Sequence, residues 1–263
     1  MAETDSVAVV HIDPPVIRRI ETDQPWKWLI AGWEDMRNNM ALSLGYGAVM
    51  AIVGYALTFG LYSIGWYYLI LPLAGGFLIM GPVLATGLYE MSRERQLGNS
   101  VEFGDVISAF TRNPSQILLM GVALLVLFIF WARVAALLFM LYFGTEPPSF
   151  ADLFRETFLS VSSIPFVVLG TAIGGVFAAA AFAISAISIP MLLDRPEQNA
   201  MMAMITSITA VRANWQAMAL WAGLIGVFTA FGLVTLYIGL VVTLPLIGHA
   251  TWHAYKDLVR APA

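Results

Sequence analysis

Arg133 is the charged residue in the most unusual chemical setting. It is the only charge between Gln116 and Phe143, a stretch that is long and apolar enough to cross a membrane. An arginine at the centre of a bilayer costs at least about 2.5 kcal/mol, so we expect it to have a partner. In one interpretation the guanidinium reaches outward and holds the following loop through its acids, Glu146, Asp152 or Glu156. In the other it binds an anion or a lipid headgroup.

His249 and His253 are four residues apart, so both imidazoles would share one face of a helix. Neutral imidazole is a ligand for Zn, Cu, Fe and Ni, which makes this pair our candidate metal or haem site. A stable site needs further ligands. The chain has no cysteine, and the soft ligands expected on the same side are Met191, Met201 and Met202. The alternative is that both histidines hydrogen-bond to neighbouring helix ends, with no cofactor.

Three apolar segments each contain a proline and close with an acid: Pro82 with Glu90, Pro190 with Asp194, and Pro245 with Asp257. Each proline removes a backbone N–H and is expected to kink its helix. The acids at the membrane edge could form a ring, or could pair with nearby arginines, Arg93, Arg195 and Arg260. Glu90 is also a candidate proton or cation relay, because it lies at the edge of the apolar stretch.

The composition is that of a membrane protein. Of 263 residues, 59% are hydrophobic and 11% are charged, against about 25% charged in soluble domains. No charge occurs between Arg37 and Glu90, or between Arg212 and Lys256. One crossing of the hydrocarbon core needs roughly 20 residues, so each gap predicts two helices joined by a turn. We therefore expect an all-α protein with six transmembrane helices in three hairpins, over residues 41–63, 67–89, 116–143, 164–193, 215–234 and 236–255.

A short amphipathic segment is expected before each hairpin. These segments begin near Asp23, Asn99 and Asp194, and they end in Arg37-Asn38, Arg112-Asn113 and Arg212-x-Asn214. The first has tryptophans on one face, which is typical of a helix lying at the membrane interface. Three such units in one orientation predict a parallel internal repeat. Residues 1–22 are polar and lack periodicity, so we expect a disordered cytosolic tail before a single domain over 23–260. The alternative is that the motif at residues 16–20 docks on the bundle or on anionic headgroups.

The positive-inside rule favours six crossings with both termini in the cytosol. In that topology every Lys and Arg falls on one side, apart from Arg133 and Arg155. Five crossings would put Lys256 and Arg260 on the opposite side.

Four strings carry a resemblance to a known family: GWED before the first membrane helix, then GLYExSR, PMLLDR and GHATWHAY. Together they resemble a bacterial family of integral membrane proteins, a domain of unknown function, and the resemblance covers about Ile17 to Val259. It implies a protein of the bacterial inner (cytoplasmic) membrane, and it brings no functional residue with it.

The sequence has no phosphate-binding loop, catalytic triad or metalloprotease motif, so we do not expect an enzyme. The leading hypothesis is a scaffold, assembly or regulatory component of a membrane complex, or a protein that organises lipid. The alternatives are a small-solute transporter or channel, and a metal- or haem-linked redox accessory subunit. The expected partners are the lipid bilayer and other membrane proteins, and nucleic acid is not expected.

Overall fold

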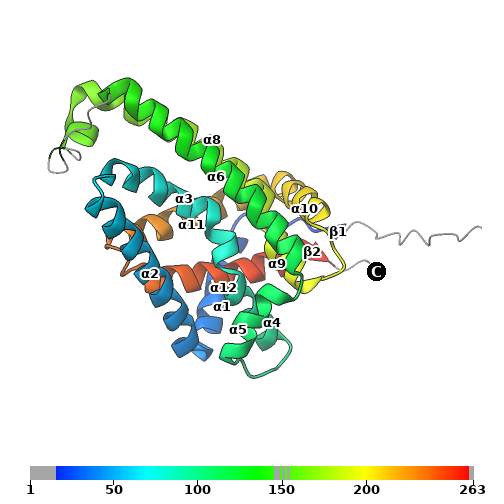
Figure 1. Ribbon diagram of the computed structural model, residues 1–263. Helices are drawn as coiled ribbons and strands as arrows, with labels where there is room; N and C mark the ends of the chain where they lie inside the picture. Colours follow the sequence, from blue (N-terminus) through cyan, green and yellow to red (C-terminus); the bar gives the residue numbers. More distant parts are fainter. Residues whose placement is uncertain (1–15, 145–148, 150–151, 153–154, 261–263) are drawn as a thin grey trace, which may run out of the picture.

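The computed structural model describes residues 16–144, 149, 152 and 155–260, and the chain in these ranges is almost entirely helical (Figure 1). The elements are β1 (Val16–Ile17), α1 (Gln24–Asn38), α2 (Met40–Ser63), η1 (Tyr67–Leu69), α3 (Ile70–Leu84), α4 (Thr86–Gln96), α5 (Phe103–Ser108), η2 (Ala109–Thr111), α6 (Pro114–Phe143), η3 (Arg155–Leu159), η4 (Val161–Ser163), α8 (Ile164–Ser185), α9 (Ser188–Asp194), α10 (Ala200–Ala213), α11 (Trp215–Val234), α12 (Leu240–Leu258) and β2 (Val259–Arg260).

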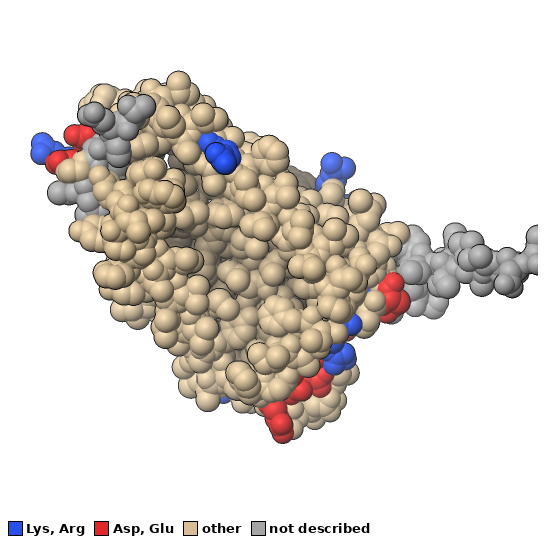
Figure 2. Space-filling view, viewed as in Figure 1, with Lys and Arg blue, Asp and Glu red and all other residues tan. Residues whose placement is uncertain are grey.

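Five segments among the described residues are long and apolar enough to cross a membrane: Met40–Ser63, Tyr67–Gln96, Pro114–Phe143, Val161–Asp194 and Trp215–Val234. They coincide with the first five predicted membrane helices. The sixth predicted helix, 236–255, corresponds to α12, which is not among the five. Figure 2 shows a broad face with few charged side chains, and most of the charge lies at its edges.

The helix α12 lies at the centre of the molecule, enclosed by α1, α2, α4 and α11 (Figure 1). Its C-terminal half is buried, with Trp252, Tyr255 and Leu258 fully enclosed. Because protein rather than lipid surrounds this half, it can carry histidines and hydroxyls. Those polar residues lower its hydropathy and separate it from the five apolar spans. By contrast, α6 and α8 pair with each other and extend beyond the rest of the molecule.

Two of the three predicted kinks lie at short interruptions between consecutive helices. Pro82 lies near the end of α3, and Ala85 separates α3 from α4. The hydroxyl of Thr86 donates to the Val83 carbonyl at 2.7 Å, and that of Tyr46 donates to the Leu84 carbonyl at 2.6 Å. These side chains supply hydrogen bonds at the interrupted turn, as an apolar environment requires. Similarly, α9, which contains Pro190, is separated from α8.

Pro245 lies inside α12, which stays continuous around it. Because a proline has no backbone N–H, the carbonyl four residues earlier has no helical partner. In α12 this is the carbonyl of Val241. Gly47 of α2 packs directly against this carbonyl: a Cβ added there would lie 2.4 Å from the Val241 oxygen. Gly32 of α1 is also packed against the backbone of α12, since a Cβ added there would lie 2.6 Å from the Ala250 nitrogen. Small residues thus let α1 and α2 contact the backbone of α12.

The three predicted units share one detail at the joint between amphipathic and membrane helix. An asparagine occupies the N-cap position of α2, α6 and α11, and its φ/ψ angles are −126/44° at Asn39, −142/64° at Asn113 and −124/36° at Asn214. The prediction named Asn38 in the first unit, but the equivalent residue is Asn39. Two helix starts also differ from the prediction: α5 is capped by Glu102 rather than Asn99, and α10 by Asn199 rather than Asp194.

The two ends of the described chain are joined. Strand β1 pairs with β2 in antiparallel register, with Val16 opposite Arg260. Asn214 fixes the same segment, because its Oδ1 accepts from the Ile20 N–H and its Nδ2 donates to the Arg18 carbonyl, both at 2.9 Å. The tail predicted over residues 1–22 therefore includes a segment, 16–20, that docks on the bundle. Residues 1–15 lie outside the described residues.

The contact between Gly47 and Val241 predicts that alanine at two nearby glycines of α2, Gly47 and Gly45, will change the stability of the protein by different amounts. Gly47→Ala should destabilise the protein by about 1–3 kcal/mol, because the added methyl group overlaps a backbone carbonyl that cannot move alone. Gly45→Ala is the matched control, since a Cβ there meets nothing within 4 Å, and it should be neutral or slightly stabilising. Thermal unfolding in detergent measures both. Equal stability of the two variants would contradict the packing described.

Candidate functional site

His249 is fully buried, and serine hydroxyls occupy both of its ring nitrogens. Nε2 lies 3.0 Å from the Ser43 hydroxyl of α2, and Nδ1 lies 2.8 Å from the Ser92 hydroxyl of α4. One nitrogen must donate and the other accept when the ring is neutral. His249 therefore links α12 to two neighbouring helices through a satisfied pair of hydrogen bonds.

Asp35 of α1 is the centre of the adjoining polar cluster. Its Oδ2 lies 2.8 Å from His253 Nε2, and its Oδ1 lies 3.0 Å from Arg95 Nη1. Burial opposes ionisation of this carboxyl, but hydrogen bonds from His253 and Ser92 outweigh it and hold the pKa of Asp35 below its ordinary value. The side chains of His253, Asp35, Ser92 and His249 thus form a hydrogen-bonded chain from the surface into the protein.

The predicted metal or haem site does not fit this arrangement. His249 has no ring nitrogen free for a ligand, and His253 is directed at Asp35. Within the described ranges no cluster of three or more His, Asp or Glu side chains could hold a metal ion. The donor set favours hydrogen bonding between helices, with Ser43, Ser92 and Asp35 as the partners of the two histidines.

Glu90 is almost fully buried, at 1% exposure, in a cluster with two arginines. Its Oε1 accepts from Arg112 Nε at 2.7 Å and from Arg93 Nη1 at 3.2 Å. Both arginines also contact Glu94, which in turn accepts from Asn99 at 2.6 Å. The second oxygen of Glu90 has no hydrogen-bond partner. With two carboxylates and two guanidiniums, the cluster is close to neutral and ties α4 to the segment before α6.

The other two acids join the chain termini to the bundle. Asp194 accepts from the Tyr255 hydroxyl at 2.7 Å and from Lys256 at 3.1 Å. Asp257 accepts from Gln24 and from Trp28 Nε1, both at 2.7 Å. Glu90, Asp194 and Asp257 therefore have separate partners and do not meet in one acidic ring.

Arg133 lies on the exposed face of α6. It lines an open hollow of about 620 Å³ with Trp66, Tyr68 and Phe139. Among the residues that the structure describes, it has no ion pair, and the predicted partner Glu146 lies outside them. Asp152 contacts Ser149 instead, through a 2.6 Å hydrogen bond.

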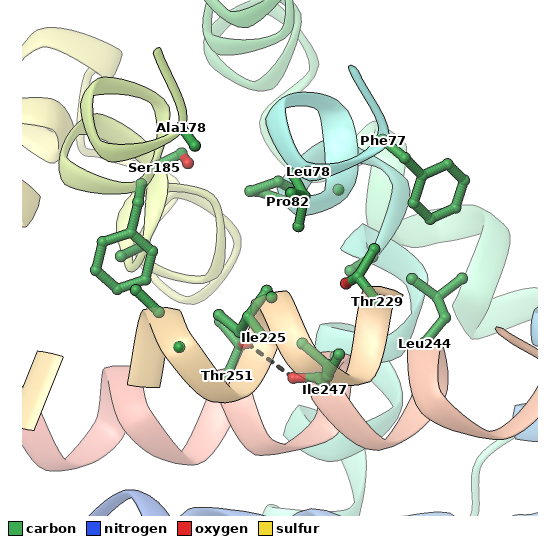
Figure 3. Close-up of a pocket in the computed structure, with 18 of the residues that line it drawn as sticks. Phe77, Leu78, Pro82, Ala178, Ser185, Ile225, Thr229, Leu244, Ile247 and Thr251 are labelled. Carbon is green, nitrogen blue, oxygen red and sulfur yellow. Dashed lines mark hydrogen bonds between the residues drawn. The ribbon is translucent and has the colours of Figure 1, made fainter. Parts of the chain in front are cut away.

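An apolar cavity, which we call cavity 1, lies between α3, α8, α11 and α12 and has a volume of about 410 Å³ (Figure 3). Leu78 and Pro82 project into it from α3, Ile225 from α11, and Ile247 and Leu244 from α12. No charged side chain lines it. Its few hydroxyls are already used in part, since Thr251 donates to the Ile247 carbonyl and Ser185 to the Ala181 carbonyl, at 2.8 and 2.6 Å.

Glycines keep cavity 1 open. A Cβ added at Gly81, Gly175, Gly223 or Gly226 would meet nothing within 4 Å. A second apolar cavity of about 410 Å³ lies between α3, α6 and α8 and shares Leu78, Gly175 and Ala178 with the first. The two cavities meet at Gly175 and Ala178, and their lining residues on α8 together run from Phe166 to Ser185. This is a length of roughly 30 Å at 1.5 Å per residue, close to the thickness of the hydrocarbon core.

The helices α3, α6 and α8 and the site residues around Glu90 lie in a segment that matches a known family, whereas α11 and α12 lie outside it. Residues 70–194 match the model of the family described as Predicted integral membrane protein (DUF2189). The matched segment runs from α3 to α9 and includes Glu90, Arg133 and Pro190. No curated protein and no solved structure matches the chain.

The protein is thus an integral membrane protein with several apolar helices, as the sequence predicted. The resemblance to an integral membrane protein family of unknown function is confirmed over residues 70–194. GLYExSR lies within this range, PMLLDR ends one residue beyond it, and GHATWHAY lies outside it.

The sequence motifs did not indicate Asp35, Ser43 and Ser92, the partners of the two histidines. One signal was present, because Asp35 belongs to the GWED string. The serines gave none, since single serines in apolar helices are common. Cavity 1 was also missed: its glycines lie on α3, α8 and α11, and only their packing brings them together.

The hydrogen bonds of Asp35 predict a pH-dependent stability. Asp35→Asn should lower the free energy of unfolding by about 1–3 kcal/mol near pH 7, because His253 and Arg95 lose their ionised partner. A carboxyl with a lowered pKa stabilises the folded state above its unfolded pKa of about 3.9, and this contribution disappears as pH falls through the folded value. The difference between wild type and variant should therefore persist at pH 5 and shrink below about pH 4.

The matched control is Glu34→Gln, which removes an exposed carboxylate from the same helix. It should leave the unfolding curve unchanged across this pH range. A variant Asp35→Asn that unfolds like wild type at pH 7 would show that the cluster does not hold α1 in place.

Proposed function

We propose that this chain is a non-enzymatic membrane protein that binds the hydrocarbon chain of a lipid in cavity 1 and acts as a lipid-organising scaffold. Cavity 1 carries the proposal. Its walls come from helices of all three repeated units, it has no charged lining residue, and glycines leave it open. Ligand pockets of a few hundred Å³ with apolar walls are typical of sites for small apolar ligands.

Lipid chains are the ligands that such a cavity meets at the highest concentration. The walls of cavity 1 come from α3, α8, α11 and α12. The first three of these helices lie in candidate membrane spans. A chain bound there would contact all three units at once, and would hold their relative positions. This is the physical basis for a scaffold whose shape depends on bound lipid.

Six membrane crossings are part of the proposal, with α12 as the sixth. The pairing of β1 with β2 supports it, because it holds residues 16–17 and 259–260 on the same side. Five crossings would separate these residues by the width of the bilayer. The polar residues of α12 are compatible with a membrane crossing, because α1, α2, α4 and α11 enclose this helix and its polar half does not face lipid.

The cytosolic side of the bacterial inner membrane is proposed for both termini, because the side that holds them also holds most of the Lys and Arg residues. The α2–α3, α6–α8 and α11–α12 turns then lie on the far side. The α6–α8 and α11–α12 pairs pack as hairpins, whereas α2 packs mainly on α12 and α3 mainly on α6.

A small-solute transporter is the second candidate. One observation favours it: cavity 1 lies between repeated units and beside the interrupted helices α3–α4 and α8–α9, as transport sites often do. The uncharged lining limits such a solute to an apolar one. Arg133 lines a separate hollow on α6 and takes no part in this site.

Filling cavity 1 should remove a bound lipid. Gly226→Leu places a side chain in the open space without a backbone clash. Native mass spectrometry of protein extracted in mild detergent should show lipid retained by the wild type and at least about tenfold less retained by the variant, which corresponds to about 1.4 kcal/mol. Gly60→Leu is the control, because Gly60 is equally open but lies on α2, away from both cavities.

Equal retention of lipid by wild type and Gly226→Leu would overturn the lipid-binding proposal. Flux of an apolar solute in proteoliposomes that Gly226→Leu abolishes, and Gly60→Leu does not, would favour the transporter instead.

The proposed topology can be tested with single cysteines, since the chain contains none. Cysteines at Gly98 and Arg260 should react with an impermeant maleimide only from the cytosolic side. A cysteine at Gly65, in the turn after α2, should react only from the far side. Labelling of the Arg260 position from the far side would support five crossings and exclude α12 as the sixth.

A further inference from the structure

The helices α1 and α10 are equivalent position by position up to the start of the next membrane helix. Residues 24–40 correspond to residues 199–215, so that Arg37 corresponds to Arg212 and Asn39 to Asn214. Four of the five buried positions of each helix coincide too, Trp28 with Ala203, for example. Both helices therefore present the same face to the bundle and leave the same face uncovered.

The uncovered face is apolar in both. Trp26, Ile30 and Trp33 of α1 are 51%, 62% and 43% exposed. Met201 and Ile205 of α10 are 62% and 51% exposed. The second unit has a similar stripe, with Phe103, Ile107 and Phe110 on α5 and η2. A helix with one apolar face packed and another apolar face bare has the pattern of a helix at the membrane interface.

An exposed arginine follows the stripe in the first and third units. Arg37 and Arg212 are exposed, and neither forms an ion pair or hydrogen bond with another described residue. The second unit differs, because Arg112 is occupied by Glu90 and Glu94. Met40 and Trp215 lie one turn after the two arginines, are exposed, and begin the membrane helices α2 and α11.

We propose that Arg37 and Arg212 each bind the phosphate of an anionic phospholipid, while the apolar stripes of α1 and α10 enter the adjoining acyl region. Continuity supports a lipid over a protein partner: each stripe leads through its arginine directly into the exposed face of a membrane helix. The guanidinium then lies at headgroup depth, where it forms paired hydrogen bonds with phosphate oxygens. This site is independent of cavity 1.

The test uses the full-length protein in detergent, titrated with phosphatidylglycerol or phosphatidylcholine and followed by native mass spectrometry. The wild type should bind phosphatidylglycerol more tightly. Each of Arg37→Gln and Arg212→Gln should weaken that binding by about fivefold, because a basic side chain near an anionic surface contributes about 1 kcal/mol. Binding of phosphatidylcholine should change little, since the substitutions remove no apolar surface.

Arg19→Gln is the matched control, since it removes one exposed positive charge from the same end of the molecule. It should leave the preference for phosphatidylglycerol intact. The proposal is overturned if Arg37→Gln/Arg212→Gln keeps the wild-type preference, or if Arg19→Gln weakens it equally. Thermal unfolding of each variant shows whether the fold is retained, and Arg37→Lys/Arg212→Lys, which keeps the charge, should recover part of the preference.

Discussion

The enclosure of α12 is the constraint on which the rest of the structure depends. Its C-terminal half carries His249 and His253, which are costly to place in hydrocarbon. The protein surrounds this half with α1, α2 and α4 and satisfies the histidines with Ser43, Ser92 and Asp35. Close approach is possible because Gly32 and Gly47 lack side chains at the two contact points. The polar groups are thus kept away from lipid and paired with each other.

This central helix also explains why the three predicted units are not equally placed. The third unit contributes α12, and the first unit wraps around it with α1, α2 and α4. The second unit, with α6 and α8, packs on α3 and stays outside. Because the units are displaced in this way, α3, α8, α11 and α12 meet around an open apolar space instead of closing on each other. Cavity 1 is a consequence of the asymmetric packing of similar units.

The two kinds of proposed lipid site lie at different depths in the membrane. Cavity 1 and its neighbour lie along α8 within the apolar spans, whereas the stripes and arginines of α1 and α10 lie at the end where the chain termini meet. Asn39 and Asn214 join α1 to α2 and α10 to α11 with similar backbone angles. The proposed headgroup contact beside Asn214 and the proposed chain contacts in cavity 1 would both involve α11.

The all-helical membrane class and five of the spans followed from the sequence alone, because hydrocarbon imposes length and apolarity on each crossing separately. The sequence also predicted the Arg212-x-Asn214 joint before α11, although before α2 it indicated Asn38 where Asn39 is the equivalent residue. The partners of His249, the pairing of Glu90 with Arg112, the docking of residues 16–20 and cavity 1 became visible only in the fold. Each of these depends on which helices become neighbours. That is set by close packing of small residues across distant segments, and such packing leaves no local periodic signal.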